Sequence, residues 1–236
     1  MKPAFKRVLI KLSGESLSGE SSSGIDKKAC DHVISAIKSL HKLGCQIGIV
    51  IGGGNFFRGV LAKEFNLGRV PADHIGMLAT VMNGIFLSEA LQKASVGSVV
   101  MGSKDYGGVA EVFNHQIACE YLSQNKDVIF VGGTGNPYFT TDTAAALRAC
   151  EIKAEVLLKA TKVNGIYNKD PMKYSDAKKY ETLSYAQALS DDLKVMDAAA
   201  IVLCRDENIP VFVFNLFAEN AFVKAVCSLE GGTKVS

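Results

Sequence analysis

The sequence lacks the features that mark membrane, secreted and nucleic-acid-binding proteins. No apolar run approaches the ~18 residues that a membrane span needs. The apolar stretch near the N-terminus is broken by Lys11, Ser13 and Glu15, so it is too short for a signal peptide. The net charge of +2 is spread without basic runs, which offers nucleic acid or an anionic membrane no electrostatic attraction. We expect a cytoplasmic protein with no nucleic-acid or membrane partner.

The six cysteines lie far apart, with no C-x-x-C pair and no histidine at ligand spacing. This spacing argues against a zinc site or a disulfide scaffold and predicts buried, reduced thiols. Apolar residues make up 48% of the 236 residues and charged residues 21%, which is typical of a globular chain with a sizeable core. The length suits one large α/β domain or two small ones.

Short apolar runs alternate with segments of helical period, which predicts a mostly parallel sheet covered by helices on both faces. The expected strands are 5–12, 46–51, 98–102, 128–132, 155–159 and 210–215. The expected helices are 26–44, capped by Asp26 and ended by Gly44, together with 73–94, 108–124, 141–151, 197–207 and 218–228. The polar stretch 168–179 is the best candidate for a seam between two lobes of one domain.

Loops of small residues follow four of the expected strands, at 11–14, 52–55, 132–135 and 161–165. Glycine lets backbone N–H groups approach a ligand closely, and N–H groups at a helix start attract phosphate oxygens. One such loop is more often only a tight turn. Because ligands bind beyond the carboxyl ends of strands in these sheets, four such loops together favour a shared anion site.

The common nucleotide-binding fingerprints are absent. No Gly-Lys is followed by Ser or Thr, so there is no P-loop, and Ser13-Gly14-Glu15 stands where a dinucleotide fold has G-x-G-x-x-G. Protein-kinase signatures are missing as well. A phosphate-binding protein with this sequence must therefore bind phosphate through a different loop motif.

Six ordered runs, spread over nearly the whole chain, resemble the bacterial uridylate kinases of the amino-acid-kinase family. They are Lys11–Glu15, Ile51–Gly59, Asp73–Asn83, Thr134–Asp142, Lys159–Lys162 and Lys194–Asp197. The resemblance implies a three-layer α/β/α sandwich with a mostly parallel central sheet, ATP and Mg²⁺ as cosubstrates, UMP as acceptor, and usually a homohexamer. It also implies an acceptor-binding lobe of roughly 1–150 and an ATP-binding lobe of roughly 151–236.

Four residues are candidates for catalysis. Lys11 ends a strand, and a charge there is unusual unless an anion faces it; in the resembling family the matching lysine stabilises the transferring phosphoryl group. Asp197 reads as a helix N-cap, and the resemblance adds a role in orienting lysine. Arg58 should lie in the first turn of a helix, where a bound anion would offset the dipole. Asp142 is either a polar neighbour of the phosphates or a helix cap.

The remaining candidates are assigned by the resemblance, with Thr134 and Asn136 reading the imide edge of uracil and Asp73 accepting from ribose hydroxyls, or capping a long helix. The expected acceptor contacts are Gly53, Arg58, Asp73, Thr134, Gly135, Asn136, Pro137, Tyr138, Phe139, Thr140 and Thr141. The expected ATP contacts are Lys11, Leu12, Ser13, Gly14, Gly54, Arg58, Thr161, Tyr167 and Asp170. Asn164 departs from the Asp more usual in the last of these loops.

A phosphate monoester is already anionic near neutral pH, so this transfer requires no general base. No metal-ligand set is expected in the protein, because few carboxylates cluster in the loops and the triphosphate itself would carry Mg²⁺. Three alternatives stay open: a kinase of the same fold for a carboxylate or carbamate acceptor, a non-catalytic nucleotide sensor, and a dinucleotide oxidoreductase. The run Thr134–Asp142 speaks against the first, and the joint presence of Lys11, Arg58 and Asp197 against the second.

Overall fold

The computed structural model describes residues 2–21, 23–171, 173–191, 193 and 195–236. Lys194, which belongs to the last of the matched runs, lies outside the described residues. The strands are β1 (Arg7–Leu12), β2 (Gln46–Ile51), β3 (Ser98–Gly102), β4 (Glu111–Val112), β5 (Asp127–Val131), β6 (Val156–Thr161), β7 (Thr182–Leu183), β8 (Val211–Asn215) and β9 (Gly232–Val235). The helices are α1 (Lys27–Lys42), α2 (Gly59–Glu64), α3 (Arg69–Lys93), α4 (His115–Ser123), α5 (Thr141–Glu151), α6 (Tyr185–Ser190), α7 (Ala198–Asp206) and α8 (Ala221–Ser228).

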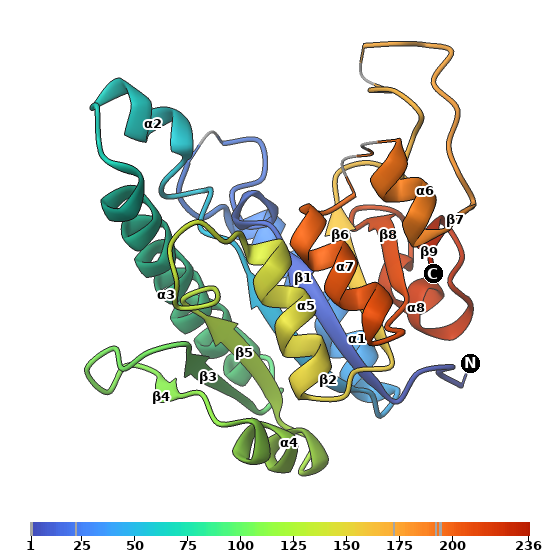
Figure 1. Ribbon diagram of the computed structural model, residues 1–236. Coiled ribbons are helices and arrows are strands. Elements are labelled where there is room, and N and C mark those ends of the chain that lie inside the picture. Colours follow the sequence, from blue (N-terminus) through green and yellow to red (C-terminus); the bar gives the residue numbers. More distant parts are fainter. Residues whose placement is uncertain (1, 22, 172, 192, 194) are drawn as a thin grey trace.

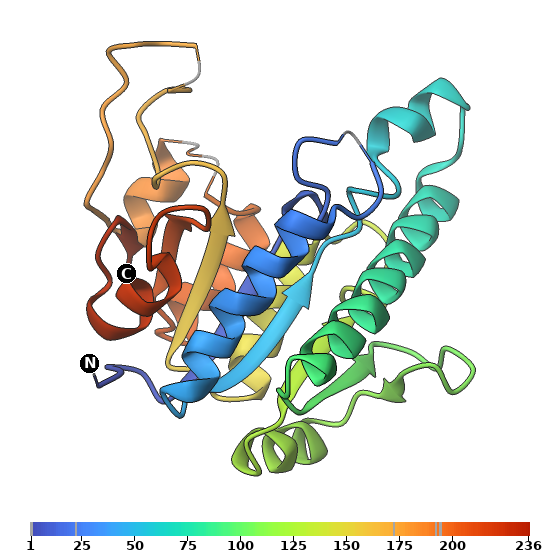
Figure 2. The ribbon, with the colours of Figure 1, turned by 180° about the vertical axis from the view of Figure 1, so that it is seen from behind.

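The described strands form one sheet in the order β4-β3-β5-β2-β1-β6-β8-β9-β7. All neighbouring pairs are parallel except β8 and β9, which run antiparallel. Helices α1, α3 and α8 cover one face of the sheet, and α4 to α7 cover the other (Figures 1 and 2). The predicted α/β class and its mostly parallel sheet are confirmed.

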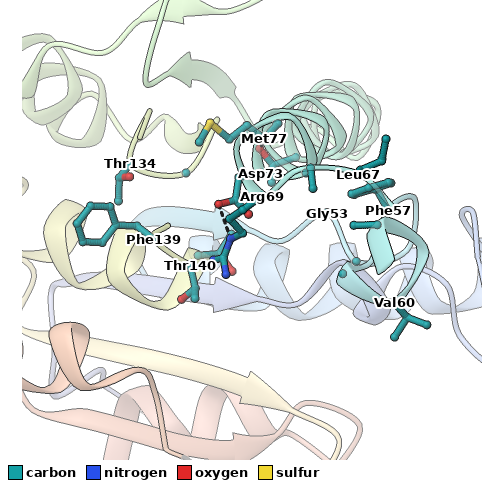
Figure 3. Close-up of a pocket in the computed structure, with 18 of the residues that line it drawn as sticks. Gly53, Phe57, Val60, Leu67, Arg69, Asp73, Met77, Thr134, Phe139 and Thr140 are labelled. Carbon is teal, nitrogen blue, oxygen red and sulfur yellow. Dashed lines mark hydrogen bonds and ion pairs between the residues drawn. The ribbon is translucent and has the colours of Figure 1, made fainter. Parts of the chain in front are cut away.

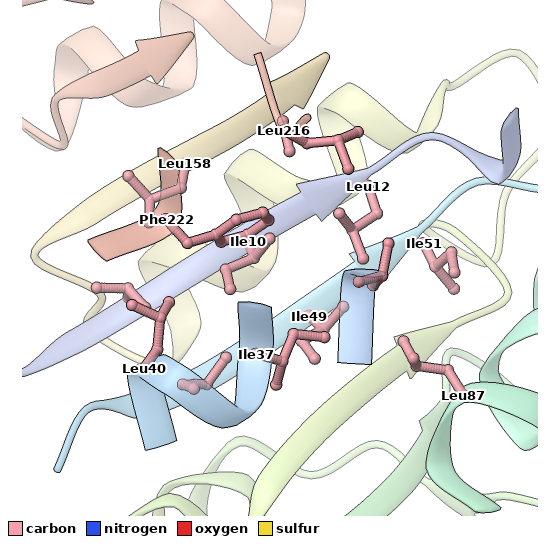
Figure 4. Close-up of a cluster of buried hydrophobic side chains, with 14 of the residues drawn as sticks. Ile10, Leu12, Ile37, Leu40, Ile49, Ile51, Leu87, Leu158, Leu216 and Phe222 are labelled. Atoms are coloured by element: carbon pink, nitrogen blue, oxygen red, sulfur yellow. The ribbon is translucent and has the colours of Figure 1, made fainter. Parts of the chain in front are cut away.

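A separate hydrophobic core lies on each face of the sheet. On one face Ile10 and Leu12 of β1 pack with Ile37 of α1 and Leu87 of α3 (Figure 4). On the other face Leu9 of β1 packs beneath the alanine-rich α5 and α7. Successive strand residues point to opposite faces, so the continuous apolar runs of the central strands follow from burial on both sides.

The long predicted elements are confirmed within a few residues of their bounds, and Asp26 caps α1 through a hydrogen bond from the Ala29 N–H, 2.8 Å. The single helix predicted at 108–124 is wrong in its first half. There Glu111–Val112 pair with β3, and the helix begins only after Asn114, whose side chain caps it. The sequence patterns also did not predict β7, α6 and β9, and they gave no bounds for the helix expected at Arg58, which is α2.

Helix α3 is long and apolar enough, by length and composition alone, to cross a membrane. Nearly half of that apolar window is buried, and α3 packs along β3 and β5 in the manner of a core helix. It begins at Arg69, so Asp73 lies inside the helix and the predicted N-cap role of Asp73 is wrong.

The parallel strands β1, β2, β5 and β6 end at the same edge of the sheet. The loops that follow them, at 13–16, 52–58, 132–140 and 162–165, therefore lie along one edge. The first loop requires a glycine at position 14, because the backbone of the second loop approaches it closely. A Cβ on Gly14 would lie 2.7 Å from the Gly54 amide nitrogen and 2.9 Å from the Gly52 carbonyl oxygen. The first two loops therefore abut.

Candidate active site

Two lysines face each other at the carboxyl edge of the sheet. Lys11 of β1 and Lys159 of β6 are register partners on neighbouring parallel strands. Asp142, in the first turn of α5, reaches between them: its Oδ1 lies 2.9 Å from Lys11 Nζ, and its Oδ2 lies 2.9 Å from Lys159 Nζ. The Lys159 contact is a hydrogen bond, whereas the Lys11 contact is an ion pair without hydrogen-bond geometry.

This cluster is nearly closed to solvent, with side-chain exposures of 11% for Lys11, 16% for Asp142 and 14% for Lys159. Burial alone would raise the pKa of Asp142, but the two lysines hold it below its ordinary value. Burial lowers the pKa of Lys159, and Asp142 opposes that shift. The three residues carry a net positive charge, because two ammonium groups share one carboxylate. An anion approaching the cluster would be attracted.

Asp197 caps α7, as predicted, by accepting a hydrogen bond from the Ala200 N–H, 2.9 Å. Its other oxygen accepts from the hydroxyls of Thr143, 2.7 Å, and Thr140. The carboxylate in contact with Lys11 is Asp142. Asp197 ties the start of α7 to the start of α5, and its charge opposes the lowering of the Lys159 pKa that burial causes. The role of orienting lysine, which the resemblance gives to Asp197, stays a prediction.

Arg58 lies just before α2, in extended conformation, and not within the first turn as predicted. Its Nε donates to the Gly54 carbonyl, 2.8 Å, and its guanidinium lies 3.0 Å from Glu15 Oε1. Both side chains are more than 40% exposed. The guanidinium is thus held against the glycine loop, where a bound phosphate could replace Glu15.

A cavity of about 600 Å³ opens between α2, α3 and the loop before α5 (Figure 3). Among the expected acceptor contacts it is lined by Gly53, Asp73, Thr134, Phe139, Thr140 and Thr141; the ATP candidate Gly54 also lines it. Gly135, Asn136, Pro137 and Tyr138 lie in the same loop, outside the lining. The Thr134 hydroxyl accepts from the Asn136 N–H, 3.2 Å, which turns this loop back on itself.

Asp73 is oriented from two sides. Its Oδ2 accepts from Arg69 Nε, 2.7 Å (Figure 3). It also accepts from the Tyr138 N–H, 2.7 Å. Partial burial would raise the pKa of Asp73, but these two hydrogen bonds hold it below its ordinary value. Tyr138 has a φ of 74°, the left-handed region that non-glycine residues rarely adopt. Both bonds use one carboxylate oxygen. Within the described part of the chain no hydrogen bond or ion pair reaches Oδ1, so that oxygen can accept a hydrogen bond from a ligand in the cavity.

A second cavity, of about 520 Å³, lies beyond the end of β6. The expected ATP contacts Thr161, Tyr167 and Asp170 all line it, and so does Lys159. Leu12, Ser13 and Gly14 lie at the neighbouring end of β1 and its 3₁₀ turn. The cluster of Lys11, Asp142 and Lys159 thus lies between the two cavities, since Thr141 of the first cavity directly precedes Asp142.

Three residues of this site received no role from the sequence: Lys159, Arg69 and Thr143. Lys159 carried a usable signal, because, like Lys11, it is a charge at the carboxyl end of an otherwise apolar run. Arg69 and Asp73 have the i, i+4 spacing of a helical ion pair, but the predicted helix began four residues too late. Nothing in the local sequence of Thr143 indicates a contact with Asp197.

Comparison with known proteins gives a consistent family assignment. The amino acid kinase family matches residues 6–215. A uridylate kinase of Protochlamydia amoebophila is 53% identical over 232 residues, which cover 98% of this chain and 92% of the relative. The crystal structure of UMP kinase from Bacillus anthracis matches with a TM-score of 0.94 and 38% identity, covering 98% and 96% of the two chains. That of UMP kinase from Ureaplasma parvum matches with a TM-score of 0.91 and 37% identity over both full lengths. The chain belongs to the amino acid kinase family, within its group of uridylate kinases.

Proposed function

We propose that this protein transfers the γ-phosphoryl group of MgATP to UMP, giving UDP and ADP, as a step of pyrimidine nucleotide biosynthesis. The observation that carries this proposal is the position of Lys11, Asp142 and Lys159 between two cavities. A phosphoryl group passing from a donor in the second cavity to an acceptor in the first would cross this positive cluster. Its transition-state charge would be balanced there.

The reaction requires the protein to align the two substrates and to balance their negative charges, and it does not require proton transfer. An oxygen of the UMP phosphate attacks the γ-phosphorus, and that oxygen is already anionic near neutral pH. In this proposal Arg58 and the N–H groups of Gly53 and Gly54 would hold the acceptor phosphate. Lys11 and Lys159 would meet the transferring group.

Mg²⁺ would reach this site with the triphosphate. In the described part of the chain no group of three or more His, Cys, Asp or Glu is placed to hold a metal ion. The donor set therefore fits an ion held mainly by phosphate oxygens and water. When bound, Mg²⁺ supplies neutralisation of the phosphate charges.

Two other functions fit parts of the structure. A same-fold kinase for a carboxylate or carbamate acceptor would use the same lysine cluster, but its small acceptor has no need of a loop such as 133–141 beside a cavity of about 600 Å³. A non-catalytic nucleotide sensor would have no use for two buried lysines converging between the cavities. Both are weaker than the proposal for these reasons.

Base selectivity tests the acceptor assignment. We expect kcat/KM for UMP to exceed that for CMP at least tenfold, because Thr134 and Asn136 would pair with the imide edge of uracil and stay unpaired against cytosine. The measurement is coupled ADP release with each nucleotide titrated at saturating ATP. Comparable kcat/KM values would mean that this loop does not read the base.

The Arg58→Ala variant tests which cavity binds UMP and which binds ATP. We expect Arg58→Ala to raise KM for UMP about tenfold or more, with a much smaller change in KM for ATP, because one charge-assisted contact to the acceptor phosphate is lost. The matched control is Arg205→Ala, on α7, whose guanidinium pairs with the adjacent Asp206 and is half exposed. A larger rise in KM for ATP than for UMP would mean that the two cavities are exchanged.

We also propose a cytoplasmic homohexamer, with an acceptor lobe of roughly 1–150 and an ATP lobe of roughly 151–236. The support for assembly is an apolar stripe on the outer face of α3, formed by Leu78, Met82, Ile85 and Phe86, each at least 37% exposed. Such a stripe on a monomer is typical of an interface. Light scattering in solution should give the mass of six protomers, and a monomer mass at assay concentration would rule the assembly out.

A further inference from the structure

Two asparagines form a closed pair of hydrogen bonds inside the protein, beside the proposed phosphate site. Asn55 ends the glycine loop after β2, and Asn83 lies on the inner face of α3; they are 1% and 0% exposed. Asn55 Nδ2 donates to Asn83 Oδ1, 3.0 Å, and Asn83 Nδ2 donates back to Asn55 Oδ1, 2.7 Å. Because both side chains are buried, neither can contact a substrate.

The second hydrogen atom of each amide fixes another part of the chain. Asn83 Nδ2 donates to the Gly52 carbonyl, 2.7 Å, and Asn55 Nδ2 donates to the Gly24 carbonyl, 2.9 Å. The Gly24 N–H in turn donates to the Asn55 carbonyl, 2.8 Å. The pair thus joins three segments: the loop after β2, helix α3 and the segment that precedes α1. Every amide hydrogen is used, which a buried polar network requires to be stable.

The glycine loop has little room to move relative to this pair. A Cβ on Gly14 would lie 2.4 Å from Asn55 Oδ1, and a Cβ on Gly53 would lie 2.7 Å from the Ala79 Cβ of α3. One turn before Asn83, the Thr80 hydroxyl accepts from the Gly132 N–H, 2.7 Å. Buried polar groups of α3 therefore hold two of the loops that surround the proposed phosphate site.

We propose that Asn55 and Asn83 are positioning residues for phosphoryl transfer. They fix the backbone of Gly52–Gly54, and with it Arg58, whose Nε is bound to the Gly54 carbonyl. This inference rests on the proposed function, because it assigns the glycine loop to the phosphates. A loop that shifts by a fraction of an ångström would misplace its N–H groups when the transition state forms, which affects kcat more than folding.

Asn83→Asp tests the proposal with a nearly isosteric change. A carboxylate oxygen replaces the amide nitrogen and so faces the Gly52 carbonyl and Asn55 Oδ1, the two acceptors to which Asn83 now donates. We expect kcat at saturating UMP and ATP to fall at least tenfold, while circular dichroism shows a folded protein at the assay temperature. Near-wild-type kcat in the folded variant would overturn the proposal.

The pH profile supplies a signature that a purely structural role would not give. Burial should raise the pKa of the introduced carboxyl group, and its protonated form can again donate one hydrogen bond. The ratio of variant to wild-type kcat should therefore rise as the pH is lowered from 8 to 6. kcat is calculated per folded molecule for both proteins. If the ratio of the two kcat values then stays constant with pH, the lost hydrogen-bond donor does not matter for the reaction.

Ser88→Ala is the matched control on the same helix. Ser88 is buried, and its hydroxyl bonds Ser98 Oγ of β3, 2.9 Å, at a distance from all four loops. This variant should lose thermal stability but keep kcat within twofold of wild type. A loss of kcat as large as that of Asn83→Asp would overturn the proposal, because any weakening of α3 would then suffice.

If Asn83→Asp does not fold, Asn55→Asp is measured by the same criteria, since it leaves the bond from Asn83 to the Gly52 carbonyl in place. The activity of the wild-type protein distinguishes a failure of the proposed function from a failure of the positioning role. Absence of UMP-dependent ADP release in the wild type would refute the proposed function itself. An active wild type with unaffected asparagine variants would refute only the positioning role.

Discussion

Replacing Lys11 with alanine should lower kcat by about 10² to 10³ while leaving the protein folded. The ammonium group lies between the two cavities, where the charge that it balances grows as the transition state forms. The fold should survive, because Asp142 keeps its 2.9 Å contact with Lys159 and is not left as an unpaired buried charge. kcat and kcat/KM should fall together, as for an interaction made mainly in the transition state.

Lys27→Ala is the control for that variant. Lys27 is 85% exposed and pairs with Asp31 one turn along α1, and such surface pairs contribute little to stability. Its kcat should equal that of the wild type. If the Lys11→Ala protein is folded and its kcat is close to that of Lys27→Ala, Lys11 has no role in catalysis.

Asp142→Asn should lower both kcat and stability. The substitution leaves two buried ammonium groups in register on neighbouring strands without the carboxylate between them. Breaking such a partly buried pair costs about 3–5 kcal/mol, and the repulsion would turn the lysines away from their present positions. We expect kcat to fall by about 10², measured at saturating substrates, together with a clear drop in Tm.

The pH dependence of that drop follows from the lowered pKa of Asp142. A carboxyl group whose folded-state pKa is depressed stabilises the protein above its unfolded-state pKa and loses that contribution as the pH falls through the folded value. The Tm difference between wild type and Asp142→Asn should therefore be largest near neutral pH and should shrink below about pH 4. A difference that is constant with pH would contradict the pairing of Asp142 with the lysines.

Asp127→Asn is the matched control for a buried acidic side chain away from the site. Asp127 starts β5, at the opposite edge of the sheet, and burial raises its pKa to about 8. Its side chain is 1% exposed and lies 3.4 Å from His41. The variant should keep wild-type kcat. An equal loss of kcat in both variants would mean that replacing any buried acidic side chain lowers kcat, whether or not it contacts Lys11 and Lys159.

The sequence predicted those parts of the fold and site that depend on local pattern. Long apolar runs and helical periodicity gave the central strands and α1, and Lys11 stood out as a charge at a strand end. The short elements were not predicted, because they are defined by their pairing partners and not by a local sequence pattern. Thr182–Leu183 of β7 is a strand only through its pairing with residues 234–235, and α2 is too short to show a period.

The lysine cluster shows why the rest of the site could not be predicted. Lys11 and Lys159 are 148 positions apart, and only the register of β1 against β6 places them opposite each other. Asp142 reaches them because α5 crosses that edge of the sheet, which no local pattern encodes. The hydrogen bonds of Asp197 to the threonines at the start of α5 also join residues more than 50 positions apart, so the sequence alone could not predict them.

The most direct test of the central claim is the identity of the phosphoryl acceptor. The purified protein is incubated with MgATP labelled in the γ-phosphate and, separately, with UMP, CMP, acetylglutamate or carbamate, and the labelled products are separated by chromatography. We expect label in UDP, formed with UMP far faster than product is formed with any other acceptor. Label transferred to acetylglutamate or carbamate at a comparable rate, or no label in UDP, would contradict it.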